Sequence, residues 1–194
     1  MKLIDGTGKS YGAQVNDANQ LEVHASVAQQ QHWYSEVKGQ AYQVHGITDT
    51  LTSATVPILH LLNTSSDKEV IVTYIRHQVI DTNATIPATD NYFGVGFGRT
   101  YSSGGTAITP TNMNTGSGNA AEVTCYHSTP TLTGTNTEID RYYNESEASL
   151  LIYNKQGSIV IAPNDTLELY YVSTATAGIA YARLSFYMQP IGAG

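Results

Sequence analysis

The fold is decided by the stretch Val56–Asp81, VPILHLLNTSSDKEVIVTYIRHQVID. Its two runs, Val56–Leu62 and Glu69–Ile80, are rich in β-branched and aromatic residues, which favour strands. The segment between them, Asn63–Lys68, is polar, and its side-chain oxygens can accept hydrogen bonds from backbone N–H groups at a bend. Two strand-forming runs around such a bend predict a β-hairpin near the middle of the chain.

The second run of this hairpin is long for a strand and carries apolar side chains on both faces. Because successive side chains of a strand point to opposite faces, the run divides into Val70, Val72, Tyr74 and Ile80 on one side and Ile71, Thr73, Ile75 and Val79 on the other. This pattern predicts a central strand with packing on each side. The residues Arg76–Gln78 interrupt it, and we expect a bend or an exit from the core there.

The composition indicates one β-rich domain with an extension. The chain has 194 residues, enough to bury a core, and only 13% of them are charged. It holds 17 glycines and 14 tyrosines, which suit short strands and turns better than long helices. The single Cys125 cannot form an intrachain disulfide, and its apolar strand context indicates an inert buried thiol.

Charge and hydropathy argue against two classes of partner. The formal net charge is −7 and the isoelectric point is about 5.2, which disfavours binding to a nucleic-acid phosphate backbone. No apolar run approaches the length of a membrane span, and the N-terminal sequence MKLIDGTGKS does not have the pattern of a signal peptide. We therefore expect a soluble protein, made in the cytosol, that binds neither nucleic acid nor a membrane.

Residues 1–39 form the predicted N-terminal arm and linker, ahead of a head domain at residues 40–194. Within the arm, the segments KSYGAQV and QLEVHA predict a small hairpin around Asn16–Asn19. A two-stranded piece of this kind is marginal alone and needs a partner surface. The segment Ser26–Val37 fits two interpretations, a short helix that Gly39 ends or an extended linker.

The head domain contains further predicted strands joined by loops of unequal length. They cover Tyr42–Leu51, Tyr92–Thr100, Ala121–His127, Thr137–Tyr143, Ala148–Tyr153 and Ile179–Met188. A second hairpin is predicted from Ile159–Ile161 and Leu167–Val172 over Ala162–Asp165. In the last strand the alternation predicts that Ala180, Ala182, Leu184, Phe186 and Met188 face inward. About eight strands of this size predict an all-β fold, a jelly-roll-like β-sandwich with an extended N-terminal arm.

Two features of the head predict close packing against a partner. Gly94, Gly96 and Gly98 fall on one face of a strand, and a bare glycine face lets another chain or an aromatic ring approach the backbone. The loop Ser102–Asn119 is long and lacks apolar periodicity, and such loops are usually functional or lie against a partner. The candidate subunit-packing residues are Gly94, Gly96, Pro110, Asn112 and Asn114.

Four stretches span most of the chain in order: DGTGKSYGAQVNDANQLEVHA, LLNTSSDKEVIVTYI, TPTNMNTGSGNAA, and IAPNDTLELYYV with ARLSFYM. Together they resemble tailed-bacteriophage virion proteins of the head-decoration or head-fibre type. The resemblance implies a β-sandwich head, an N-terminal arm used in assembly, a homotrimer and a place on the outside of the virion. It implies neither catalytic residues nor a cofactor.

The resemblance also implies a protein partner, the major capsid protein or a neighbouring virion protein. The arm hairpin has edges whose unpaired N–H and C=O groups can add to a partner sheet. The candidate partner-binding residues of the arm are Tyr11, Val15, Leu21 and Val23.

Three chemical alternatives remain beside this structural role. The six histidines are scattered without the spacing of a metal site, although a site on an oligomer axis needs only one histidine per chain. Tyr74, Arg76 and His77, with the cluster Asp140–Tyr143, contain the residue types of β-sandwich polysaccharide lyases, but nothing local makes them converge. Outward tyrosines with asparagine and threonine in the loops suit a glycan-binding, receptor-recognition module. We expect a non-enzymatic protein, with glycan recognition as the alternative and a lyase as the less favoured one.

Overall fold

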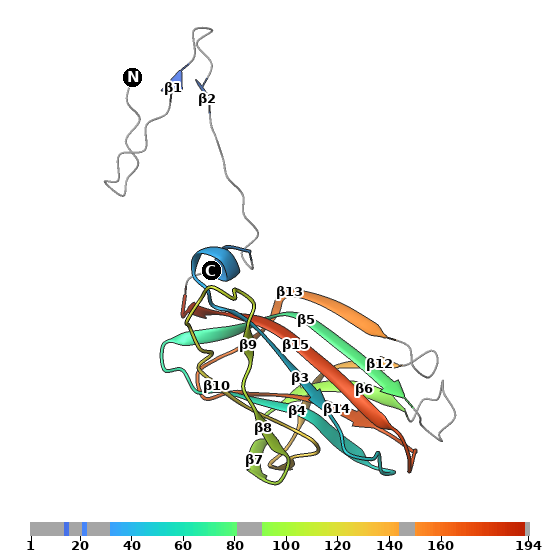
Figure 1. Ribbon diagram of the computed structural model, residues 1–194. Coiled ribbons are helices and arrows are strands. Elements are labelled where there is room, and N and C mark those ends of the chain that lie inside the picture. Colours follow the sequence, from blue (N-terminus) through green and yellow to red (C-terminus); the bar gives the residue numbers. More distant parts are fainter. Residues whose placement is uncertain (1–13, 16–20, 23–31, 81–90, 144–149, 193–194) are drawn as a thin grey trace.

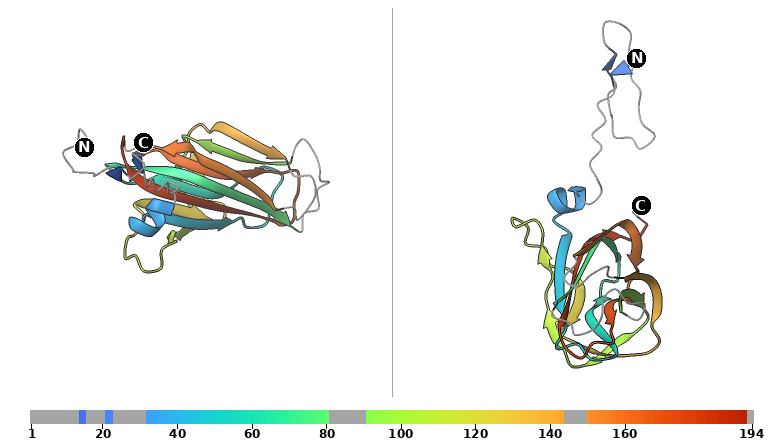
Figure 2. Two further views of the ribbon diagram at one scale, coloured as in Figure 1. Left: turned by 90° about the horizontal axis from the view of Figure 1, so that it is seen from above. Right: turned by 90° about the vertical axis from the view of Figure 1, so that its right-hand side faces the viewer.

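Two antiparallel β-sheets pack face to face in the computed structural model of this protein, which describes residues 14–15, 21–22, 32–80, 91–143 and 150–192 (Figure 1). Figure 2 shows the two layers from two further directions. The main hydrophobic core lies between the sheets and draws its side chains from both of them. The all-β sandwich predicted from the sequence is confirmed.

The two sheets differ in strand order. The first sheet has the order β13-β5-β15-β3-β9 and consists of β3 (Ala41–Ile47), β5 (Lys68–Ile80), β9 (Thr111–Asn112), β13 (Leu151–Ile161) and β15 (Ile179–Pro190). The second sheet has the order β12-β6-β14-β4-β10-β8 and consists of β4 (Thr55–Asn63), β6 (Tyr92–Phe97), β8 (Thr106–Ile108), β10 (Val123–His127), β12 (Thr137–Tyr143) and β14 (Thr166–Val172).

The connections between these strands follow the pattern of an eight-stranded jelly roll. The row β3-β15-β5-β13 of the first sheet faces the row β4-β14-β6-β12 of the second. Each connection crosses from one sheet to the other, except the passage from β6 to β12. That passage carries an insertion in which β7 (Thr100–Ser103) pairs with β11 (Thr131–Thr133), while β8, β9 and β10 extend the two sheets.

The N-terminal elements are small. β1 (Gln14–Val15) pairs with β2 (Leu21–Glu22) in a separate two-stranded sheet, which confirms the strand pairing predicted for the arm. The bend Asn16–Asn19 lies outside the described residues. A π-helical turn, η1 (Trp33–Val37), occupies the end of the segment Ser26–Val37, whose sequence fits either a short helix or an extended linker. Gly39 follows it with a φ of +58°, a conformation that suits glycine at the end of a helical turn.

The hairpin predicted for Val56–Asp81 is wrong in one respect. Both strands form, but β4 pairs with β14 and β10 in the second sheet, whereas β5 pairs with β15 and β13 in the first. The polar bend therefore carries the chain from one sheet to the other. Local sequence does not distinguish these outcomes, because a polar bend between two strands serves a hairpin and a sheet crossing equally well.

Asn63 holds this crossing together. Its side chain is fully buried, and its Nδ2 donates hydrogen bonds to the carbonyl oxygens of Lys68 at 2.9 Å and Ile161 at 3.1 Å. Its Oδ1 accepts a hydrogen bond from the backbone N–H of Ser65 at 3.1 Å. The side chain thus satisfies backbone groups of β5 and β13 from the end of β4, and so joins the two sheets at one corner.

β5 does not bend at Arg76–Gln78 as expected, because its pairing with β15 continues to Ile80. The irregularity lies instead at Thr73, where β15 pairs with Tyr74 and then with Val72. An extra residue of this kind changes which side chains share a face. The core side chains of this strand are Val70 and Val72 before the bulge, and Ile75 and Val79 after it.

Three further expectations need correction. The second predicted hairpin is also a sheet crossing, because β13 belongs to the first sheet and β14 to the second. The strands predicted at Ala148–Tyr153 and Ile159–Ile161 join into the single strand β13, whose pairing shifts between Asn154 and Ile159. The loop Ser102–Asn119 contains the short strands β8 and β9 and the end of β7.

β15 confirms the alternation read from its sequence. Its five inward residues, Ala180, Ala182, Leu184, Phe186 and Met188, are each at most 2% exposed. On the opposite face, Tyr181 and Arg183 are exposed, whereas Ser185 and Tyr187 are buried. The outer face of the first sheet is therefore covered at one end of β15 and open at the other.

Candidate functional site

The covered end of the first sheet is where the N-terminal segment meets the sandwich. Tyr34 of η1 is buried, and its ring stacks on Tyr187 with 4.8 Å between centroids. Ala41 and Ile71 complete this second hydrophobic cluster, which lies outside the main core. We call the contact between η1 and the sandwich the junction.

The asparagine-rich part of the insertion binds the junction from the side. Nδ2 of Asn114 donates to the carbonyl oxygens of Ser35 at 3.1 Å and Glu36 at 3.3 Å. Nδ2 of Asn112 donates to the carbonyl oxygen of Gly39 at 2.8 Å. These carbonyls belong to the last turn of η1 and its end, where no intrahelical donor reaches them. Side-chain amides supply the missing hydrogen bonds.

Gly39 is required at this point by space as well as by conformation. A Cβ on Gly39 would lie 2.3 Å from the side-chain oxygen of Ser117, which itself donates a hydrogen bond to the Gly39 carbonyl at 3.2 Å. Asn119 donates from Nδ2 to the carbonyl oxygen of Lys38 at 2.9 Å. Several side-chain hydrogen bonds therefore fix the orientation of the backbone at Lys38 and Gly39, where η1 joins the sandwich.

Replacing Asn114 by alanine is expected to loosen η1 without unfolding the head. The substitution removes two hydrogen bonds to carbonyls of η1, each contributing about 1 kcal/mol. Amide hydrogen exchange at Lys38 and Gln40, which bond to carbonyls of η1, should accelerate by roughly 5- to 30-fold. The exposed neighbour Thr115 offers a matched control, because Thr115→Ala should leave these rates unchanged. Unchanged exchange in Asn114→Ala contradicts the assignment.

The candidate partner-binding residues fall into three groups, at the junction, in the arm and on the glycine face of β6. Asn112 and Asn114 lie at the junction, and the buried Pro110 precedes β9 next to it. Val15 and Leu21 are paired through their backbones, whereas Tyr11 and Val23 lie outside the described residues. The junction contacts are made within the chain, and contacts of any of these residues with a partner stay a prediction.

Gly94 and Gly96 are covered by side chains of the same chain. A Cβ on Gly94 would lie 2.1 Å from Cζ of Tyr170, and one on Gly96 would lie 2.0 Å from Oδ1 of Asn136. The aromatic ring expected against the glycine face is therefore Tyr170. Both glycines are buried, so the space left by their absent side chains is filled within the chain.

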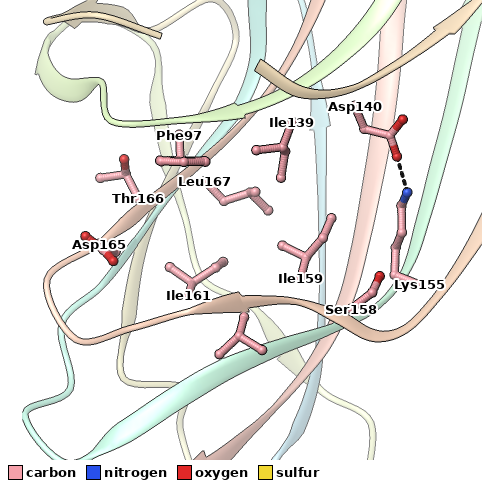
Figure 3. A pocket seen from close by; sticks show the side chains of 11 residues that line it. Phe97, Ile139, Asp140, Lys155, Ser158, Ile159, Ile161, Asp165, Thr166 and Leu167 are labelled. Atoms are coloured by element: carbon pink, nitrogen blue, oxygen red, sulfur yellow. Dashed lines mark hydrogen bonds and ion pairs between the residues drawn. The ribbon is translucent and has the colours of Figure 1, made fainter. Parts of the chain in front are cut away.

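A second candidate site is a groove at the open side of the sandwich, between β12 and β13 (Figure 3). Each of these strands is the outermost described strand of its sheet, so each has an edge there that no other described strand pairs with. The groove has a volume of about 440 Å³, and its apolar side chains are those of Phe97, Ile139, Ile159, Ile161 and Leu167. The sequence gives only a weak indication of this groove, because the apolar residues of β13 lie on both of its faces. The exposed Val160 shows that not all of them face the core.

An ion pair between Asp140 and Lys155 lies at one end of the groove, as Figure 3 shows. The rings of Tyr142 and Tyr153 stack beside it with 3.5 Å between centroids, and the Lys155 ammonium lies 4.9 Å from the Tyr142 ring. Burial and the hydrogen bond to Asp140 raise the pKa of the Tyr142 hydroxyl. The cluster joins β12 to β13 and so links the two sheets.

His77 lies beneath this cluster in the core. The centroid of its ring lies 4.4 Å from the ring centroid of Phe93. The ring centroids of Tyr142 and Tyr153 lie 5.9 and 6.0 Å away. Neither ring nitrogen has a hydrogen-bond partner among the described residues. Burial, with a smaller effect from the charge of Lys155, lowers the pKa of His77 to about 3. The ring is therefore neutral at physiological pH.

Of the two polar–aromatic clusters in the sequence, Tyr74–His77 and Asp140–Tyr143, only some residues come together in the structure. His77 joins Tyr142 in the interior, whereas Tyr74 and Arg76 point to the outer face of the first sheet, because neighbouring residues of a strand point in opposite directions. In the described part of the chain, no three histidine, cysteine or acidic side chains gather to hold a metal ion. Cys125 is buried, and burial raises the pKa of its thiol to about 12.

No protein-family model matches the chain, and no curated protein matches it. Among the residues that the structure describes, there is no helix with the length and apolar character needed to cross a membrane.

Proposed function

We propose that this protein is a non-enzymatic structural component of a bacteriophage virion, of the head-decoration type. In this proposal residues 1–39 attach the protein to the particle, and the sandwich of residues 40–194 is presented outward. The partner is the major capsid protein or a neighbouring virion protein.

The junction is the observation that carries this proposal. Of the residues that the structure describes, none before Tyr42 belongs to the main core, so the described interior of the sandwich is built without the N-terminal segment. Nevertheless the stacked pair Tyr34–Tyr187 and the amides of Asn112 and Asn114 hold the base of that segment in one orientation. A segment that is dispensable for the core but fixed at its base is suited to attachment.

Oligomerisation fits the same role. We propose a homotrimer, in which three tethered arms turn later binding steps into intramolecular ones and raise avidity without stronger single contacts. The edges of β12 and β13 and the apolar groove between them support an assembly contact, because a partner strand can hydrogen-bond to an open sheet edge. Light scattering should then give three times the chain mass of 20.9 kDa.

Deletion of residues 1–31 is expected to leave a folded head that no longer attaches to the particle. The deletion retains η1 and Tyr34, and therefore the second hydrophobic cluster. Binding to phage particles that lack the protein, measured by co-sedimentation, should fall by roughly 100-fold or more because the tethered contacts are lost.

A chain in which the order of residues 1–31 is scrambled is the matched control, since it preserves length and composition. It should fail to attach like the deletion variant. If the deletion variant attaches as tightly as the full chain, the arm is not the attachment element and the proposal is wrong.

A further inference from the structure

The open end of the first sheet presents an unusual row of basic side chains on its outer face. His45 of β3 lies opposite Arg183 of β15, which in turn lies opposite Arg76 of β5. All three side chains are exposed. Opposed residues of neighbouring antiparallel strands have Cβ atoms about 5 Å apart, so three basic groups lie in one line across three strands.

This row is electrostatically unfavourable by itself. Like charges directly opposite one another destabilise a sheet. The gathering of cations is also unexpected by composition, because the chain has only nine lysines and arginines and a net charge of −7. The other two arginines, Arg99 and Arg141, each pair with a glutamate. No acidic partner for Arg76 or Arg183 is found in the part of the chain that the structure describes.

The row lies in a hollow of about 400 Å³, within the size range of small-ligand sites. Its wall includes Tyr181, which is 36% exposed, and Leu150, which is 54% exposed. The hollow therefore combines two guanidinium groups that have no acidic partner among the described residues with an aromatic ring and an aliphatic side chain. It lies at the opposite end of β15 from the junction, so an occupant leaves η1 undisturbed.

We propose that this hollow binds the carboxylate of an acidic sugar within a polysaccharide. A guanidinium group presents parallel N–H donors that match the two oxygens of a carboxylate. The ring of Tyr181 offers a flat apolar surface for the C–H face of a pyranose, while its hydroxyl remains hydrated. The volume suits one or two sugar residues.

The test is titration calorimetry of the full chain with three hexasaccharides: a polygalacturonate fragment, a sulfated heparin fragment and neutral maltohexaose. We expect the polygalacturonate fragment to bind, and maltohexaose to bind at least roughly 10-fold more weakly because a charge-assisted hydrogen bond is lost. Arg76→Gln and Arg183→Gln should each lower the affinity by roughly 10-fold, and the double variant by roughly 100-fold.

Two further variants make the assignment specific. Tyr181→Ala should weaken hexasaccharide binding by roughly 5-fold while the protein still prefers the acidic sugar over the neutral one. Arg141→Gln removes an exposed arginine of the second sheet and should leave affinity unchanged. Because Arg76 and Arg183 are exposed and repel each other, their double variant should keep its melting temperature.

Several results overturn the proposal. They are the absence of polygalacturonate binding, equal binding of maltohexaose, unchanged affinity in the double arginine variant, or arginine-dependent binding of the sulfated fragment alone. A double variant whose mass in solution falls to that of a smaller oligomer also overturns it, because the row then binds a second copy of the chain. None of these results bears on attachment through residues 1–31, which the co-sedimentation experiment measures.

Discussion

Replacing Arg99 by methionine is expected to lower the free energy of unfolding by about 3–5 kcal/mol at neutral pH. Arg99 is the cationic partner of Glu168, which is only 1% exposed. The guanidinium binds the carboxylate through two groups: Nε donates to Oε2 at 2.8 Å, and Nη2 pairs with Oε1. Removing the arginine leaves a buried carboxylate without its charge partner, which is among the most costly single changes a protein can undergo.

The surroundings of Glu168 give it no replacement. In the second sheet it lies between Gly96 of β6, which has no side chain, and His60 of β4. His60 is itself buried, and its Nε2 donates to the carbonyl oxygen of Arg99 at 3.1 Å. Burial raises the pKa of Glu168 more than Arg99 lowers it, so the charged form of the carboxylate is disfavoured even in the native protein.

Equilibrium denaturation in urea, followed by circular dichroism, measures this effect. The double variant Arg99→Met/Glu168→Met is the control and should recover most of the lost stability, because a buried ion pair is often replaced by apolar residues at little cost. The deficit of the single variant should shrink on acidification: protonation of Glu168 in the folded state removes the buried charge at a pH above its ordinary pKa. A deficit that persists unchanged in the double variant contradicts this account.

Acidification should lower the stability of the native protein through His77, the second large effect that we expect. Its pKa is about 3 in the folded protein and about 6.5 in an unfolded chain. Between these values the unfolded state binds a proton that the folded state does not, so stability falls as the pH drops below about 6.5. Each pKa unit corresponds to about 1.4 kcal/mol, so the loss from this residue reaches about 2–3 kcal/mol at pH 4.5.

Replacing His77 by leucine should remove this dependence, because leucine has a similar volume and does not titrate. We expect the variant to lose about 2–3 kcal/mol less than the native protein between pH 7 and pH 4.5, measured by urea denaturation at each pH. At pH 7 the variant should be about as stable as the native protein or more so, since both ring nitrogens of His77 lack a partner among the described residues.

His45 provides the matched control for this experiment. It lies in the same sheet but its side chain is exposed on the outer face, so His45→Leu should leave the acid destabilisation that comes from His77 in place. If His77→Leu retains the full acid destabilisation, the burial of the neutral imidazole is not its source.

The interior alternation of β15 and the existence of β4, β5, β6, β12 and β14 were predictable from the sequence. Each depends on side chains within one strand, since a pleated strand points successive residues to opposite faces. The junction was predictable only in its parts. The sequence predicts that the asparagines of the insertion bind a partner, but the groups that Asn114 binds, on Ser35 and Glu36, are more than seventy positions away along the chain.

Local residue preferences suffice to predict that this chain forms many strands, which side chains are apolar, and where the chain turns. They do not predict that the bend at Asn63 crosses between sheets, that the bulge at Thr73 changes which side chains of β5 face the core, or that Arg76 lies opposite Arg183. The physical reason is that a strand forms from the preferences of its own residues, whereas its hydrogen-bond partners are chosen by competition among all strands for a common core. Register and charge pairing follow from that choice.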